Sequence, residues 1–255
     1  MEYGYLGKGD AQQKQFVMRK GQSTAGHAIG IVHLEVWYPL IPGNVVNATT
    51  YNFAVRYKAL RGATIPRIMR ADPGLLDLIV EAGRELEQEG VRAMVGACGY
   101  FANYQREAAA ALDIPVFLSS LLQVPMIARS LKPGQQVGIL FADASSVNQN
   151  MLESCGVASD LPIVYMGMED QPEFRNILDC TGEFNFDKLE QELVNRARKL
   201  VAEHPDVGAI LLECSDMPPF AWAIQCAVKL PVFDFISMLN WIHYGVVQRP
   251  YEGFL

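Results

Sequence analysis

Short apolar runs alternate with longer amphipathic stretches from about residue 28 to the end of the chain. The runs are rich in Val, Ile and Leu, which is typical of strands buried on both faces. This alternation predicts an α/β fold in which helices cover both faces of parallel sheets. Strands are predicted over residues 28–35, 53–59, 91–97, 114–118, 136–141, 162–165, 207–212 and 231–235. Helices are predicted over residues 73–89, 100–112, 121–131, 145–155, 171–178, 186–203, 218–228 and 236–247.

Part of this pattern occurs twice, with the second copy 116 positions after the first (98 to 214, 115 to 231). In each copy an apolar run ends at a cysteine, and a helix-length stretch and a second apolar run follow. The repeat predicts two similar parallel-sheet α/β domains related by pseudo-twofold symmetry, with the ligand site in the cleft between them. The expected limits are an N-terminal extension at 1–26, a first domain at 27–118 plus 235–255, and a second domain at 119–234.

Composition narrows the classes of partner. Half of the 255 residues are hydrophobic, 19% are charged and the net charge is −7, which fits a soluble globular protein. An acidic chain without clustered Lys and Arg argues against nucleic-acid binding, and no apolar run reaches the length of a membrane span. The polar N-terminus lacks the apolar core of a secretory signal, so we expect a cytoplasmic protein.

The five cysteines are odd in number, irregularly spaced and without a CxxC pair. A reducing compartment with free thiols is therefore expected, and no metal site is predicted. Three of the cysteines fit the role of small packed hydrophobes. These are Cys155, Cys180 and Cys226.

Cys98 and Cys214 are different, because each stands where a predicted strand gives way to a helix. Ligands of open α/β sheets bind outside the carboxyl ends of the strands. The free N–H groups of a helix start are expected to lower the pKa of a thiol there, and to hold a substrate carboxylate. Two such thiols suit an enzyme that takes a proton from one face of a carbon and returns it to the other face.

Other polar residues have both a binding and a structural interpretation. Asn44 and Asn47 follow the first strand and could bind a substrate carboxylate, or form an ordinary polar turn. Ser119, Ser120 and Ser145 follow strands and could contact substrate or cap the next helix.

Two more interpretations concern single residues. Asp216 could orient Cys214, cap its helix, or do both. Trp222 and Trp241 stand on predicted helices, and we expect both in the core.

The cysteine segments resemble a known family. Gly96-Ala97-Cys98-Gly99-Tyr100 and Glu213-Cys214-Ser215-Asp216-Met217-Pro218-Pro219 are similar to the two cysteine motifs of the aspartate/glutamate/hydantoin racemase superfamily. The resemblance runs from about residue 30 to 235. It implies two α/β domains, an active site between them and no cofactor. It also implies that one of Cys98 and Cys214 removes an α-proton while the other protonates the opposite face.

The resemblance has departures at the substrate-binding positions. Gly99 and Tyr100 stand where glutamate racemases have Asn-Thr, which help to bind the substrate amino group, and Asp216 replaces a histidine. These differences weigh against glutamate as the substrate, but Gly99, Tyr100, Ser215 and Asp216 are still predicted to bind the substrate. The Met-Pro pair after the second cysteine is also similar to the related maleate isomerases, and arylmalonate decarboxylases of the superfamily work with one cysteine.

The leading hypothesis is a cofactor-independent racemase or epimerase of an amino acid or a related small carboxylate or hydantoin. A small-molecule carboxylate is thus the expected partner, and the resemblance makes a homo-oligomer possible. The alternatives are a cis–trans isomerase or decarboxylase of a small (di)carboxylic acid on the same scaffold, and a non-catalytic protein that binds a small acid.

Overall fold

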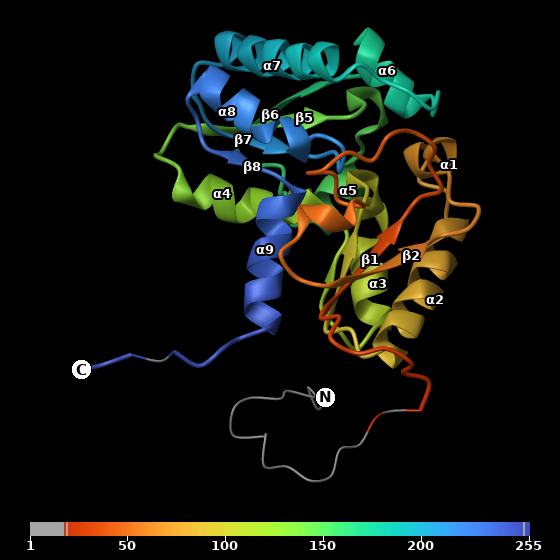
Figure 1. The fold of residues 1–255 in the computed structure, drawn as a ribbon. Coiled ribbons are helices and arrows are strands. Elements are labelled where there is room, and N and C mark those ends of the chain that lie inside the picture. Colours follow the sequence, from red (N-terminus) through yellow and green to blue (C-terminus); the bar gives the residue numbers. More distant parts are fainter. Residues whose placement is uncertain (1–17, 19, 252) are drawn as a thin grey trace.

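Parallel strands form two four-stranded sheets in the computed structural model, which describes residues 18, 20–251 and 253–255 (Figure 1). The first sheet has the order β2-β1-β3-β4 and the second β6-β5-β7-β8, with every pair parallel. This common order confirms the predicted α/β fold with two similar parallel sheets. The strands are β1 (Ile29–His33), β2 (Val55–Ala59), β3 (Ala93–Gly96), β4 (Val116–Phe117), β5 (Gln136–Phe141), β6 (Ile163–Gly167), β7 (Val207–Leu212) and β8 (Val232–Phe233).

Each of the eight predicted strands is present, and the helices differ mainly at their starts. The helices are α1 (Ile65–Met69), α2 (Gly74–Gln88), α3 (Gln105–Ala111), α4 (Val124–Ser130), α5 (Gln149–Ser154), α6 (Pro172–Leu178), α7 (Phe186–Glu203), α8 (Ala221–Val228) and α9 (Phe235–Val246). The pattern did not predict α1, which is only five residues long. The predicted extension at residues 1–26 lies mostly outside the described residues, and the domain limits remain a prediction.

Short 3-10 helices begin several connections between a strand and the next helix, where the sequence pattern predicts a continuous α-helix. They satisfy backbone groups in a single tight turn before the regular helix begins. They are η3 (Gly99–Tyr104), η4 (Ser120–Gln123), η5 (Ala144–Ser146) and η6 (Pro218–Phe220), and a further one, η2 (Ala48–Thr50), lies in the segment between β1 and β2.

The helices after β4 and β8 cross from one sheet to the other. α4 follows β4 of the first sheet but packs against β5 of the second, whereas α9 follows β8 of the second sheet and packs against β3 of the first (Figure 1). The opposite face of each sheet is covered by a long helix, α2 on β1 and α7 on β5. This exchange ties the two halves together, because each sheet is completed by a helix that follows a strand of the other.

The core beneath α9 shows the alternation that a strand imposes. Ile29 and Ile31 of β1 and Val95 of β3 point toward α9, where Phe235 and Leu239 are fully buried against them. Val32 points to the other face and joins the larger core. A parallel sheet buried on both faces therefore needs apolar residues at consecutive positions, as the continuous runs predicted.

The prediction that Trp222 and Trp241 lie in the core is wrong, since their exposed fractions are 76% and 60%. Both stand on helices that cover sheets and are largely exposed there, so an apolar residue type does not by itself decide burial. The Trp241 ring meets the Phe117 ring edge-on, with 5.9 Å between the ring centroids.

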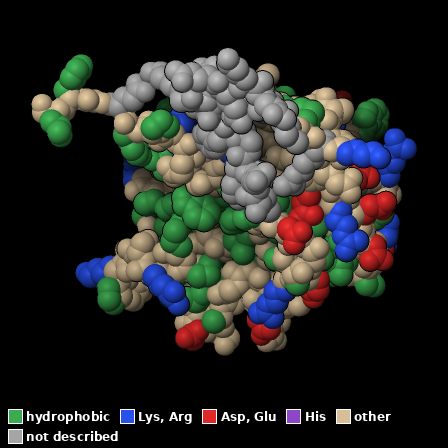
Figure 2. Space-filling model, turned by 90° about the horizontal axis from the view of Figure 1, so that it is seen from below, with side chains coloured by type: hydrophobic (Ala, Val, Ile, Leu, Met, Phe, Trp, Pro, Cys, Tyr) green, Lys and Arg blue, Asp and Glu red, His purple; other side chains and the backbone are tan. Residues whose placement is uncertain are grey.

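Figure 2 views the molecule from the side to which α9 projects in Figure 1, and hydrophobic side chains gather on this face. Among the described residues no helix has the length and apolarity needed to cross a membrane.

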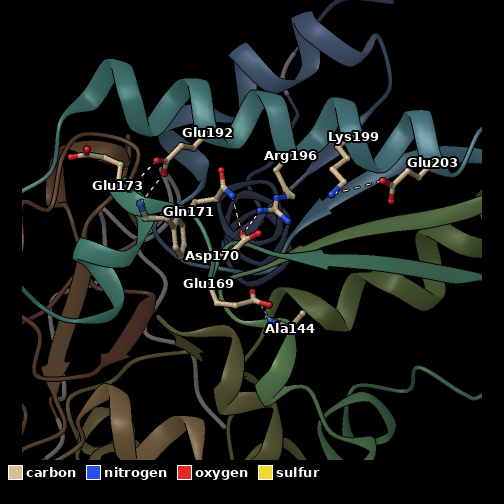
Figure 3. Close-up of polar contacts among 10 residues, drawn as sticks. Ala144, Glu169, Asp170, Gln171, Glu173, Glu192, Arg196, Lys199 and Glu203 are labelled. Atoms are coloured by element: carbon tan, nitrogen blue, oxygen red, sulfur yellow. Dashed lines mark hydrogen bonds and ion pairs between the residues drawn. The ribbon is translucent and has the colours of Figure 1, made fainter.

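Helix α6 is held on α7 by polar contacts (Figure 3). The Glu192 carboxylate of α7 accepts hydrogen bonds from the backbone N–H groups of Glu173 and Phe174, at 2.8 and 2.9 Å. These N–H groups belong to the first turn of α6 and have no partner within that helix. Arg196 of α7 also pairs with Asp170, just before α6. The contacts position α6, whose last residues form part of the cavity described below.

Replacing Glu192 by alanine should lower the free energy of unfolding by about 1–3 kcal/mol, because two helix-start N–H groups lose their acceptor. Urea denaturation followed by circular dichroism measures the effect. Glu203→Ala is the matched control on the same helix, since its 3.8 Å pair with Lys199 is exposed and should contribute at most about 0.5 kcal/mol. Equal effects of the two substitutions would contradict this account.

Candidate active site

The carboxyl ends of the strands in both sheets border one cavity. The volume of this cavity is about 540 Å³, including its open mouth. Cys98 follows β3 of the first sheet and Cys214 follows β7 of the second, and both line this space. The structure thus brings together the two cysteines that the repeat singled out. The predicted site residues that line the cavity are Asn44, Cys98, Gly99, Tyr100, Cys214, Ser215 and Asp216.

Cys98 stands directly before the 3-10 helix η3. Its backbone is extended, and the nearby backbone N–H groups of Tyr100 and Phe101 act to lower the pKa of its thiol. A tight turn after a strand end turns successive N–H groups toward the preceding side chain. The sequence therefore supplies a thiol with local donors that stabilise its ionised form.

Cys214 is held by a different arrangement, in which Asp216 is the central group. The Cys214 thiol donates to Oδ2 of Asp216 at 3.4 Å, and the same oxygen accepts from the Tyr38 hydroxyl at 3.1 Å. The Asn44 amide donates to Oδ1 at 2.5 Å. Three donors from separate segments thus fix the Asp216 carboxylate beside the thiol. Of the two roles predicted for Asp216, the contact with Cys214 is present.

The prediction that helix-start N–H groups lower the thiol pKa values is wrong in net effect. Withdrawal from water raises the pKa of Cys98, and the negative charges of Glu213 and Asp216 raise it further. The donors of η3 oppose these effects but are outweighed. Burial likewise raises the pKa of Cys214, followed by the charges of Asp216 and Glu213. In this structure both cysteines are therefore thiols near neutral pH.

Hydrogen bonds join the segments that follow the strands of the first sheet to those that follow the strands of the second sheet. The Ser215 hydroxyl donates to the carbonyl oxygen of Ala97 at 3.1 Å, next to Cys98. The Tyr100 hydroxyl meets the Asp143 backbone, donating to its carbonyl oxygen at 2.5 Å and accepting from its N–H group at 2.9 Å. Ser215 and Tyr100 line the cavity, but their polar groups hold its walls in place.

Four other predicted residues do not line the cavity. Asn47 caps η2 and donates to the Leu40 carbonyl oxygen, so it serves the turn rather than a ligand. Ser119 caps η4, and the fully buried Ser120 donates to the Leu212 carbonyl oxygen. Ser145 is exposed and bonds to Asp143. For all four, the structural role is the one that the contacts support.

Three further residues of the cavity escaped the sequence analysis. Tyr38 lies on the segment after β1, and nothing in its neighbourhood marks it as a partner of Asp216. His33 ends β1, and burial lowers the pKa of its imidazole. Glu213 was visible inside the second motif, directly before Cys214 at the end of an apolar run. A charged residue at a position predicted to be buried is a sequence signal for a functional group.

The two-sheet α/β fold is one that known racemases share. Glutamate racemase isoform RacE1 from Bacillus anthracis has a similar structure, with a TM-score of 0.57. The comparison covers 86% of this chain and 82% of that one at 14% identity, and so shows a shared fold. The sequence profile of the Asp/Glu/Hydantoin racemase family matches residues 53–241. The chain therefore belongs to this family, as the motifs predicted.

Named relatives of higher identity are lyases rather than racemases. A dimethylsulfoniopropionate lyase of Durusdinium sp. clade D is 30% identical over 234 residues, which is 89% of this chain and 77% of that protein. Dimethylsulfoniopropionate lyase 3 of Emiliania huxleyi (strain CCMP1516) is 28% identical over 236 residues. That match covers 89% of this chain, which spans 61% of the length of that relative.

Thiol reactivity checks the electrostatics of the cavity. At pH 7.5, iodoacetamide should modify the exposed Cys226 at least ~100-fold faster than Cys98 and Cys214, because the thiolate fraction falls tenfold for each unit by which a pKa is raised. Mass spectrometry of peptides from a time course gives the three rates. A Cys226→Ser variant should lose the fast phase alone, whereas rapid labelling of Cys98 or Cys214 would refute the raised pKa values.

Proposed function

We propose that this protein is a lyase that eliminates a neutral sulfide from a small carboxylate bearing a sulfonium group, with dimethylsulfoniopropionate as the candidate substrate. The observation that carries the proposal is the charge of the cavity. Two thiols and the carboxyl groups of Glu213 and Asp216 border it, and none of its described lining residues is Lys or Arg. The names of the relatives at 28–30% identity support the same reaction.

The positive charge of the substrate would favour ionisation of thiols that are otherwise protonated. A positive charge 4 Å from a sulfur atom favours the thiolate by about 4 kcal/mol at an effective dielectric constant of 20, or roughly 3 pKa units. A sulfonium group entering the cavity would therefore oppose the effects of burial and of the two carboxyl groups. The substrate would thus increase the fraction of thiolate, and the cysteines would remain thiols when substrate is absent.

The elimination needs one base. A thiolate takes the proton from the carbon next to the substrate carboxylate, and the electrons of that C–H bond form a C=C bond. The bond from the β-carbon to the sulfonium sulfur breaks, and its electron pair leaves with the sulfur. The products are dimethyl sulfide and acrylate, and the thiol returns the proton to water. Atoms and charge balance without an oxidant or a reductant.

Cys214 is the better candidate for this base. Its thiol hydrogen-bonds to the Asp216 carboxylate, which is oriented by Tyr38 and Asn44. A nucleophile or base paired with an acceptor that a third group holds in place is the usual geometry of an activated side chain. In this proposal Asp216 accepts the Cys214 proton as the substrate enters.

A second candidate function is racemisation or epimerisation of a small carboxylate, which agrees with the family. The observation that favours it is that Cys98 and Cys214 line the same cavity. In a two-base mechanism one thiolate removes the proton and the opposite thiol returns a proton to the other face. The two functions share the first step and differ in whether a leaving group departs.

Product analysis tests the choice of reaction. With dimethylsulfoniopropionate, we expect dimethyl sulfide by gas chromatography and acrylate by proton NMR in equal amounts. Glutamate, aspartate, 5-substituted hydantoins, 2-aryl acids and maleate in heavy water should show neither α-proton exchange nor a new product. Exchange with inversion in that panel, and no dimethyl sulfide, would favour the racemase instead.

Single cysteine variants test the number of bases. Cys214→Ala should lower kcat for elimination by at least ~1000-fold, and Asp216→Asn by about 100-fold, since each removes part of the base. The kcat of Cys98→Ala should remain at least ~10-fold higher than that of Cys214→Ala, because elimination needs no second proton donor. Initial rates of acrylate formation measure these effects. Equal, complete losses in both cysteine variants would point to a two-base mechanism.

A further inference from the structure

We propose that Glu213 is a specificity-determining residue whose carboxylate pairs with the positively charged group of the ligand beside Cys98. This inference rests on the proposed function, which supplies the cationic ligand. It assigns the recognition of that charge to one carboxyl group of the cavity and leaves the proton-transfer chemistry to Cys214 and Asp216.

Glu213 is a buried carboxyl group with one unused oxygen. The side chain has no exposed surface, and Oε2 accepts a hydrogen bond of 3.4 Å from the backbone N–H of Ala142. Oε1 has no partner in the structure. A buried carboxylate with an unpaired oxygen is costly, so such a group either holds a proton or meets a cation. The contacts of Glu213 thus leave one carboxyl oxygen without a partner.

Gly99 makes room for this carboxyl group next to Cys98. A Cβ atom at position 99 would lie only 1.9 Å from Oε1 of Glu213 and 2.6 Å from its backbone oxygen. Glycine is therefore needed here for close approach rather than for an unusual backbone angle. Both Gly99 and Glu213 line the cavity, and the unused oxygen lies against Gly99, the residue that follows Cys98.

Asp216, the other carboxyl group, is already occupied. Its two oxygens accept from Cys214, Tyr38 and Asn44. Of the two carboxyl groups in the cavity, Glu213 is thus the one with an acceptor left for a cation. Burial also lowers the pKa of His33, so this lining residue adds no positive charge at neutral pH.

The groups around Glu213 would disfavour its ionised form in the absence of a ligand. The titratable neighbours interacting with it from the packed segments are Cys98, Tyr100, Asp143, Cys155 and Cys214. Burial is the largest effect and raises the pKa of Glu213 to about 8, with a further contribution from the charge of Asp143. Glu213 is therefore mostly protonated at pH 7 until a cation enters.

A ligand pair that differs only in charge gives the experiment. Dimethylsulfoniopropionate carries a sulfonium group where 4-methylpentanoate has an uncharged CH of similar shape. Binding is measured by calorimetry on the full chain with Cys214→Ala, so that the cationic probe is not consumed. We expect dimethylsulfoniopropionate to bind at least ~10-fold more tightly, and Glu213→Gln to reduce this preference to less than ~3-fold without weakening 4-methylpentanoate.

The pH dependence is an independent readout that needs no substitution at Glu213. Pairing with a cation ionises Glu213 and releases its proton, so affinity for dimethylsulfoniopropionate should rise with pH by up to ~10-fold per unit below pH 8. The affinity for 4-methylpentanoate should not show this rise. A merely structural role of Glu213 would move neither the charge preference nor the slope.

Controls separate this inference from the proposed function. Glu169→Gln changes a glutamate that also accepts a backbone N–H, from Ala144, but does not line the cavity, so it should leave the preference intact. Glu213→Asp should restore part of the preference that Glu213→Gln loses. A preference for the cation in a protein that forms no acrylate would refute the lyase and support Glu213. The role of Glu213 would be overturned if the parent protein showed no preference for the cation, which includes failure to bind it. An unchanged preference in Glu213→Gln would overturn it as well.

Discussion

The site depends on the hydrogen bonds that join the strand-end segments of the two sheets. Parallel strands end at one edge, and here the edges of two sheets meet, so each cysteine is placed by a different sheet. The bond from Ser215 to Ala97 and the pair between Tyr100 and Asp143 fix one edge against the other. Each cysteine segment is therefore positioned by the sheet opposite to its own as well as by its own strand.

The same closeness buries the thiols together with two carboxyl groups, and this combination sets the protonation of the site. Local donors of a helix start are overcome by burial and by neighbouring carboxyl groups, so the thiols are protonated when the cavity holds no ligand. In the proposed function, a site of this kind becomes reactive when a positively charged ligand enters. The ligand would then supply the electrostatic balance that a lysine or arginine supplies in other enzymes.

The sequence allowed the sheets and the two cysteines to be predicted because both follow from local pattern. Continuous apolar runs locate the strands, and the repeat locates Cys98 and Cys214 at equivalent ends. Tyr38 could not be found in this way, since its contact with Asp216 joins residues 178 positions apart on irregular segments. The net pKa shifts also depend on burial and on charges brought together by folding, whereas the sequence showed only the local N–H groups.

The crossing of α9 also has a consequence for the order in which the chain folds. The second sheet is formed entirely by residues between Gln136 and Phe233, but one face of the first sheet is covered by a helix that begins at Phe235. The sheet face that carries Ile29 and Ile31 can therefore be covered only after about 200 further residues have been synthesised. At the ribosome, the half of the protein that is made first is the half that finishes folding last.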